Sequence, residues 1–186
     1  TNAGLIEVDA NFVARGIEVS AGYGDVSIAN SGTIDSYGVS DAVGIYALEN
    51  DNNTVNIANS GSIYASANGI TGGIVVGGDG ATVSVDNSGV IAAAGGNNAN
   101  FGIYINTRND GPTNYGSASV TNTGIVAAGK YSEGSLNSYG DAFGIYARSN
   151  GDITVTNTGT EDQYAGILAF NEYGGLAVGV QASSDN

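Results

Sequence analysis

Carboxylates are the side chains of this sequence most able to do chemistry, because its 186 residues include 18 Asp and Glu, 4 Lys and Arg, and neither His nor Cys. Glu7 and Asp35 hold equivalent places in two successive sequence repeats. We therefore expect them to stack about one strand spacing, ~4.8 Å, apart on a solvent-facing surface. Paired carboxylates are what glycoside hydrolysis needs. A solvated or cation-bridged pair is the simpler interpretation, and it is the one we adopt.

Lyase cleavage of an acidic polysaccharide would need a base, together with cations beside the substrate carboxylate. The chain has no His, and its cations are Arg15, Arg108, Lys130 and Arg148. These residues form no catalytic constellation in the sequence. We predict no catalytic residues and no enzyme activity.

Two oxygen-rich turns, Asp51-Asn52-Asn53 and Gly77-Gly78-Asp79-Gly80, are the candidates for a calcium site. Neither has the spacing of an EF-hand loop or a nine-residue calcium-binding repeat. The sequence therefore predicts no specific metal or cofactor, only loose association of calcium with an acidic surface.

The formal net charge of −14 limits the partners of the chain. Nucleic acids and anionic membrane surfaces would be repelled, because binding them requires clustered cations. No apolar run approaches the ~18 residues of a membrane-spanning helix, so no membrane insertion is expected. No signal peptide is recognisable, so an exported chain would be present here in mature form or as a fragment.

A repeated Asn-Ser/Thr-Gly triplet shows which elements must position these side chains. The triplets begin at Asn30, Asn59, Asn87, Asn122 and Asn157, with a weaker copy at Asn2, and they lie 28 to 35 residues apart. Asn and Gly tolerate a positive φ and suit a sharp corner. Asn side chains stacked at such corners can also form an inward ladder of amides. We predict this corner ladder for Asn30, Asn59, Asn87, Asn122 and Asn157.

Three short segments with alternating apolar residues fill each repeat. One precedes the Asn, as in 55–57, one follows the Gly, as in 63–65, and one begins at a Gly-Ile pair, as in 73–76. Strands this short need neighbours to be stable. Stacked repeats supply them, so we predict an all-β fold: a right-handed parallel β-helix, or β-solenoid, of about six coils with three strands per coil. Ile34, Ile63 and Ile91 should form one inward ladder, and Ile45, Ile74 and Ile103 another.

The Gly-Ile marker assigns a third strand to every repeat, beginning at Gly16, Gly44, Gly73, Gly102, Gly144 and Gly166. The outward column of this third strand then contains Glu18, Tyr46, Val75, Tyr104, Tyr146 and Leu168. The equivalent column of the strand that follows the corner contains Glu7, Asp35, Tyr64, Ala92, Ala127 and Asp162. The three Tyr side chains could stack on sugars or on a neighbouring subunit, or could simply cover the sheet.

The chain is expected to be a single domain, 1–186, with regular coils over 1–101, coils with corner insertions over 102–156 and a partial coil over 157–186. The insertions fall around 106–116 and 130–139. Corner insertions of solenoids often bind partners. The candidate partner-binding residues in these two loops are Arg108, Tyr115, Lys130, Tyr131 and Tyr139. Sequence drift in exposed loops remains the alternative.

The two ends of the chain are interpreted as complementary. The first coil has no strand before its corner, and 176–180 reads as that missing strand with nothing after it. An uncapped solenoid end promotes association, and a head-to-tail contact between different surfaces produces an open filament. The candidate assembly interface consists of Asn2, Gly4, Leu5, Ile6, Leu176, Val178 and Val180. The alternative is that the sequence is a fragment of a longer repeat protein, which would also begin and end with incomplete coils.

The triplets, together with the segments 41–47 and 141–147, resemble the repeats of bacterial autotransporter-type passenger domains. The resemblance implies a β-helix that is extracellular or held at the bacterial cell surface. Such repeats carry fibres, adhesins and some enzymes, so function does not follow from them. The leading hypothesis is a structural subunit of an extracellular filament that self-associates head to tail. The alternatives are an adhesin or passenger fragment that binds glycans or matrix and, less favoured, a polysaccharide-active enzyme or phage-type fibre.

Overall fold

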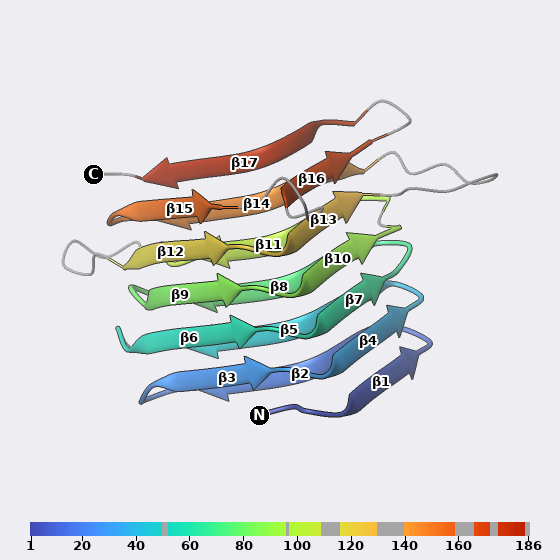
Figure 1. Cartoon of the computed structure of the whole chain (residues 1–186), viewed down its shortest axis with the longest axis horizontal. Helices are drawn as coiled ribbons and strands as arrows, with labels where there is room; N and C mark the ends of the chain where they lie inside the picture. Colours follow the sequence, from blue (N-terminus) through green and yellow to red (C-terminus); the bar gives the residue numbers. More distant parts are fainter. Residues whose placement is uncertain are drawn as a thin grey trace.

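In the computed structural model of the chain, the described residues form seventeen strands stacked in three parallel sheets. The structure describes residues 1–49, 52–95, 97–108, 116–129, 140–158, 166–171 and 175–184. Each coil after the first contributes one strand to each sheet, and the two termini lie at opposite ends of the stack (Figure 1). The predicted parallel β-solenoid of about six coils with three strands per coil is confirmed.

The three sheets are named in the order in which a coil visits them. Sheet A contains β3 (Val26–Asn30), β6 (Thr54–Asn59), β9 (Thr82–Asn87), β12 (Ser117–Asn122) and β15 (Ile153–Asn157). Sheet B contains β1 (Leu5–Ala10), β4 (Thr33–Gly38), β7 (Ser62–Ser66), β10 (Val90–Ala94), β13 (Ile125–Gly129) and β16 (Gly166–Phe170). Sheet C contains β2 (Val13–Ala21), β5 (Asp41–Glu49), β8 (Ile70–Gly78), β11 (Ala99–Asn106), β14 (Asp141–Ser149) and β17 (Ala177–Ser184).

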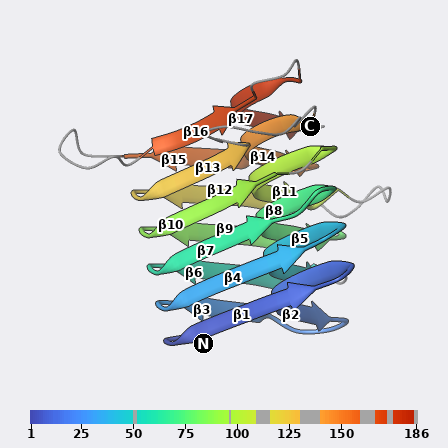
Figure 2. The same cartoon turned by 90° about the vertical axis from the view of Figure 1, so that its right-hand side faces the viewer.

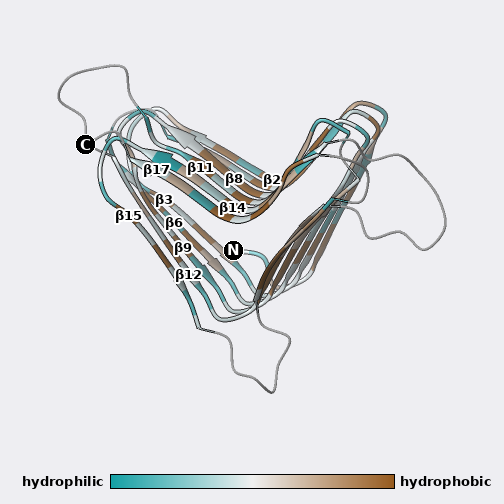
Figure 3. Cartoon of the chain, turned by 90° about the horizontal axis from the view of Figure 1, so that it is seen from above, coloured by the Kyte–Doolittle hydropathy of each residue, from teal (hydrophilic) through white to brown (hydrophobic). Residues whose placement is uncertain are grey.

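The strands of sheet B rise in regular steps from β1 to β16 (Figure 2). Coil 1 consists of β1 and β2, and coils 2 to 6 each contain three successive strands, ending with β15, β16 and β17. Seen from above, each coil has a V-shaped outline (Figure 3). Sheets A and B form the outer sides of the two arms, and sheet C bends in its middle to line the inside of the V.

Stacked isoleucines fill the space between the sheets. Ile34, Ile63 and Ile91 are in register along sheet B and are fully buried. Ile45, Ile74 and Ile103 form the corresponding ladder along sheet C. Both predicted ladders are therefore confirmed. Burying each such side chain contributes roughly 1.5–3 kcal/mol, and buried residues of sheet A, such as Val55 and Ile57, belong to the same core.

The bend in sheet C occurs at the Gly of the Gly-Ile pair. A Cβ built on Gly73 would overlap Cγ2 of Ile91 and lie 2.6 Å from the carbonyl oxygen of Gly102. Gly16, Gly44, Gly102 and Gly144 meet equivalent obstacles in the coil that follows each of them. Glycine is required because the bent strand approaches the isoleucine of sheet B and the next bent strand too closely for any side chain.

The last coil differs from the sequence prediction. Gly166, Ile167 and Leu168 lie on β16, which pairs with β13 in sheet B, so their assignment to the third strand of the repeat is wrong. The real third strand is β17, where Val180 is in register with Ile145 and Gln181 with Tyr146. The prediction that 176–180 acts as the first strand of a new coil is therefore also wrong.

The connection that departs from the regular repeat in the last coil lies between sheets A and B. Two residues separate the strands of sheets A and B in coils 2 to 5, whereas eight residues, 158–165, separate β15 from β16. Leu168, and not Asp162, is the neighbour of Ala127 along sheet B; Asp162 lies outside the described residues. The outward column of sheet C ends on Gln181 instead of Leu168.

Candidate functional site

A ladder of asparagine amides runs along the corner between sheets A and B. Each Nδ2 donates to the Oδ1 of the Asn in the next coil at 2.7–2.8 Å, from Asn2 through Asn30, Asn59, Asn87 and Asn122 to Asn157. The same amide nitrogens also donate to the carbonyl oxygen of the triplet Gly, as from Nδ2 of Asn59 to the oxygen of Gly61 at 3.3 Å. The predicted stacking of these residues is present, and Asn30, Asn59, Asn87 and Asn122 are buried.

The ladder has a direction. At one end, and within the part of the chain that the structure describes, the oxygen of Asn2 accepts a hydrogen bond from its own turn, from the backbone N–H of Gly4. At the other end Asn157 is exposed and accepts the bond from Asn122. One end of the stack therefore presents an amide donor and the other an amide acceptor.

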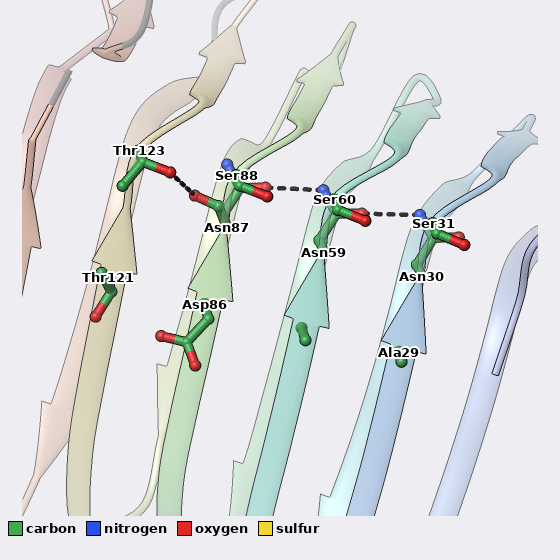
Figure 4. Close-up of a pocket in the computed structure, with 11 residues that line it drawn as sticks. Ala29, Asn30, Ser31, Asn59, Ser60, Asp86, Asn87, Ser88, Thr121 and Thr123 are labelled. Atoms are coloured by element: carbon green, nitrogen blue, oxygen red, sulfur yellow. Dashed lines mark hydrogen bonds between the residues drawn. The ribbon is translucent and has the colours of Figure 1, made fainter. Parts of the chain in front are cut away.

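The outer side of this corner is shallow and lined by short side chains (Figure 4). The lining residues include Ser31, Ser60, Ser88 and Thr123, from four successive coils, together with Asp86. The coil repeat places these side chains side by side. The lining contains no cation and no catalytic partner for Asp86. We assign this surface a structural role.

Side chains that flank the bend of sheet C on its outer face meet one another inside the V. In coil 1 they are Arg15 and Glu18, which form an ion pair at 2.5 Å. The guanidinium of Arg15 also lies 4.4 Å from the ring centroid of Tyr46 in coil 2. The bend thus brings residues i and i+3 of a strand together, which alternation in a flat strand does not do.

In coils 4 and 5 these flanking positions are aromatic. The rings of Phe101 and Tyr104 meet edge to face at 5.0 Å, and those of Phe143 and Tyr146 at 5.3 Å. Between the coils the rings are nearly parallel, with centroids 5.3 Å apart for the Phe pair and 5.4 Å apart for the Tyr pair. Tyr104 and Tyr146 are half-buried, so this aromatic cluster reaches the surface inside the V.

The cations gather on the same face. Arg15, Arg108 and Arg148 are the cations among the described residues, and all three belong to sheet C or follow it directly. Arg148 lies in register between Asn106 and Ser183. Nη2 of Arg108 donates to Oγ of Ser183 at 3.1 Å. Arg108 and Arg148 therefore belong to neighbouring coils, beside the aromatic cluster of coils 4 and 5.

The predicted partner-binding loops can be placed only in part. Arg108 is described and half-buried, and it lies at the end of the strand that carries Tyr104. Tyr115, Lys130, Tyr131 and Tyr139 lie outside the described residues. Their role as partner-binding residues stays a prediction.

The acidic groups that the structure describes do not converge on a site. Glu7 and Asp35 are in register on β1 and β4, as expected, and both are exposed. No group of three or more potential metal-ligating side chains occurs in the described part of the chain. In the predicted turns, Asp51 is not described and Asp79 is exposed.

Three features of sheet C escaped the sequence analysis. The aromatic cluster could have been found from the Phe-Gly-Ile-Tyr segments at 101–104 and 143–146, which place two aromatic residues across the bend. Gly179 was missed because Val180 replaces the marker Ile. Glu49 is fully buried at the end of β5, where its carboxylate accepts hydrogen bonds from the backbone N–H and the side-chain amide of Asn53.

The end faces of the stack expose apolar residues. At the lower end Leu5 is 66% exposed, and at the upper end Leu176 is 54% and Val180 is 43% exposed. Val180 belongs to the ladder whose inner members, such as Ile145, are fully buried. Of the predicted interface, Ile6 and Val178 are half-buried, Gly4 is exposed and Asn2 is buried.

No protein-family model, curated protein or solved structure matched this chain in the comparisons. Among the described residues, no helix has the length and apolar character needed to cross a bilayer.

Proposed function

We propose that this chain is a structural β-solenoid that stacks head to tail on further copies of itself, as part of an extracellular or bacterial surface fibre. The observation that supports the proposal best is the state of the two end faces. The ladders that are fully buried in the middle coils are half-exposed or exposed at both ends, and the outermost strands have one unpaired edge each. Open strand edges of this kind are templates for further strands.

The register of the repeat defines how two copies would meet. β1 of the upper copy would pair with β16, and β2 with β17, because each belongs to the same sheet. The amide of Asn157 would then donate to the oxygen of Asn2 in the next copy and continue the ladder in its existing direction. The lower and upper surfaces differ, so the contact would propagate without closing.

The corrected position of β17 changes one part of this contact. The C-terminal strand belongs to sheet C, so it does not supply the strand of sheet A that coil 1 lacks. One strand would be missing between β15 and β3 of the next copy. The stacking that we propose therefore rests on sheets B and C, together with the continued ladder of Asn157 and Asn2.

Gly179 supplies a sharp test. Each bend glycine faces the coil above it, and a Cβ on Gly144 would lie 2.6 Å from the carbonyl oxygen of Gly179. A Cβ on Gly179 meets nothing within 4 Å in the single chain, but in a stack it would meet the bend of the next copy. Gly179→Ala should therefore leave the solenoid folded and abolish fibres in electron micrographs.

Gly77→Ala is the matched control, because its Cβ would contact only Cδ1 of Leu48, at 3.3 Å, far from either end. Fibres of the parent chain and of Gly77→Ala, together with folded monomers of Gly179→Ala, would support the proposal. A parent chain that stays monomeric at high concentration, or fibres of Gly179→Ala as abundant as those of the parent, would refute it.

A further inference from the structure

A second surface with its own chemistry lies inside the V, on sheet C of coils 4 to 6. The outward positions after the bend are Tyr104 and Asn106 in β11, Tyr146 and Arg148 in β14, and Gln181 and Ser183 in β17. Arg108 reaches over β14 to Ser183. We call this set of seven residues the arginine–tyrosine face. It lies on the side of sheet C inside the V, and its upper edge is β17, the strand that would pair with β2 of the next copy in a stack.

The charge of this face is opposite to that of the molecule. The chain carries a net charge of −14, yet the arginine–tyrosine face contains two arginines and no carboxylate. Arginine forks match the geometry of carboxylates and form strong charge-assisted hydrogen bonds with them. A mobile anionic ligand would be repelled by most of the surface and attracted here.

The tyrosines add a different kind of contact. Tyr104 and Tyr146 present apolar rings and polar hydroxyls at half-buried positions, a combination suited to ligands that have both CH groups and hydroxyls. Tyr146 and Arg148 point the same way two residues apart, which separates them by ~6.6 Å along the strand. An anionic group of the ligand could therefore bind Arg148 while a neighbouring part of the same ligand contacts the ring of Tyr146.

We infer that the arginine–tyrosine face binds an acidic polysaccharide rich in uronic acid. Its sugar rings contact Tyr104 and Tyr146, and its carboxylates pair with Arg148 and Arg108. Asn106, Gln181 and Ser183 supply hydrogen bonds for the sugar hydroxyls. Neighbouring strands of the sheet lie ~4.8 Å apart, so a chain-like ligand that runs along the solenoid axis can contact successive coils. This inference does not require the proposed stacking, because all seven residues belong to one copy of the chain.

Calorimetric titration with a short oligogalacturonate tests the inference, with the fully methyl-esterified oligomer as a neutral ligand of the same backbone. The parent chain should bind the acid form, and its affinity should fall as salt is added. Arg148→Gln should lower the affinity about tenfold or more, because one charge-assisted pair is lost. Arg108→Gln should act in the same direction.

Arg15→Gln is the matched control in unstacked protein, because within one copy Arg15 lies on the same sheet three coils away from the arginine–tyrosine face and is paired with Glu18. Its affinity should equal that of the parent, and circular dichroism should show all three variants folded. The inference is overturned if the acid oligomer does not bind, if the methyl ester binds equally well, or if an acidic peptide binds as tightly as the glycan. An equal loss of affinity in Arg15→Gln and Arg148→Gln would also overturn it.

Discussion

At the scale of single residues, the asparagine of the corner shows how a polar side chain can be buried without loss of stability. Asn59 is 1% exposed, and its amide donates to Asn87 and accepts from Asn30. Each such bond contributes a net ~0.5–1.5 kcal/mol, but an unpaired buried partner costs more. The ladder therefore also opposes any slip of one coil against the next, because a slip would leave several amides unpaired.

Replacing Asn59 with Ala should lower the free energy of unfolding by about 1–3 kcal/mol, because Asn30 and Asn87 each lose a buried partner. Denaturant unfolding followed by circular dichroism measures the loss. Asn56→Ala is the control: Asn56 lies in the same strand but is exposed, and the change should stay within ~0.5 kcal/mol. Equal effects of the two substitutions would contradict the role assigned to the ladder.

At the scale of elements, the bend of sheet C determines the shape of the coil. The bent strands cover both arms of the V, and each bend brings two outward side chains together, as an ion pair in coil 1 and as aromatic pairs in coils 4 and 5. The bend depends on a glycine because the neighbouring backbone and the isoleucine of sheet B leave no room for a Cβ.

Gly73→Ala should lower the free energy of unfolding by about 1–3 kcal/mol, the usual effect of overpacking, because its Cβ would overlap the side chain of Ile91. Thermal unfolding provides the measurement. Gly77→Ala, four residues along the same strand, should change stability by no more than ~0.5 kcal/mol. A Gly73→Ala variant as stable as Gly77→Ala would mean that the bend can move to make room.

At the scale of the whole molecule, the coils form a one-dimensional stack in which each contacts its neighbours. Such a stack can grow at both ends, and its growth is opposed by charge, because every copy carries a net charge of −14. Among the described residues, Arg15 and Glu18 form the one ion pair. Repulsion between copies therefore acts against the apolar contacts of the end faces.

Self-association should increase as the pH falls from 7 towards the isoelectric point of about 4.1, because protonation of Asp and Glu removes the repulsion between copies. Calcium at neutral pH should also increase self-association. Its effect should exceed that of sodium chloride at the same ionic strength. Light scattering follows the reaction, with Gly179→Ala as the control that separates stacking from non-specific precipitation. An extent of association that is the same at every pH and salt concentration would contradict this account.

The sequence by itself determined the solenoid, its three strands per coil, the inward isoleucines and the corner asparagines. Each follows from the spacing of residue types: alternation defines strands, and a repeat of 28 to 35 residues requires them to stack. The inward position of residues such as Ile63 and Asn59 is predicted correctly, because the same residue type recurs at the same repeat position and has the same environment in successive coils.

Only the tertiary structure decided which sheet the last strands join and which outward side chains meet. Gly166-Ile167 and Gly179-Val180 have almost the same local pattern, and only pairing with β13 and β14 separates sheet B from sheet C. Arg108 approaches Ser183 across 75 residues of sequence, because stacking brings together strands that are far apart in the chain. The alternation of apolar and polar residues indicates which side of a strand faces inward, but the bend and the register of neighbouring coils determine what its outward side chains contact.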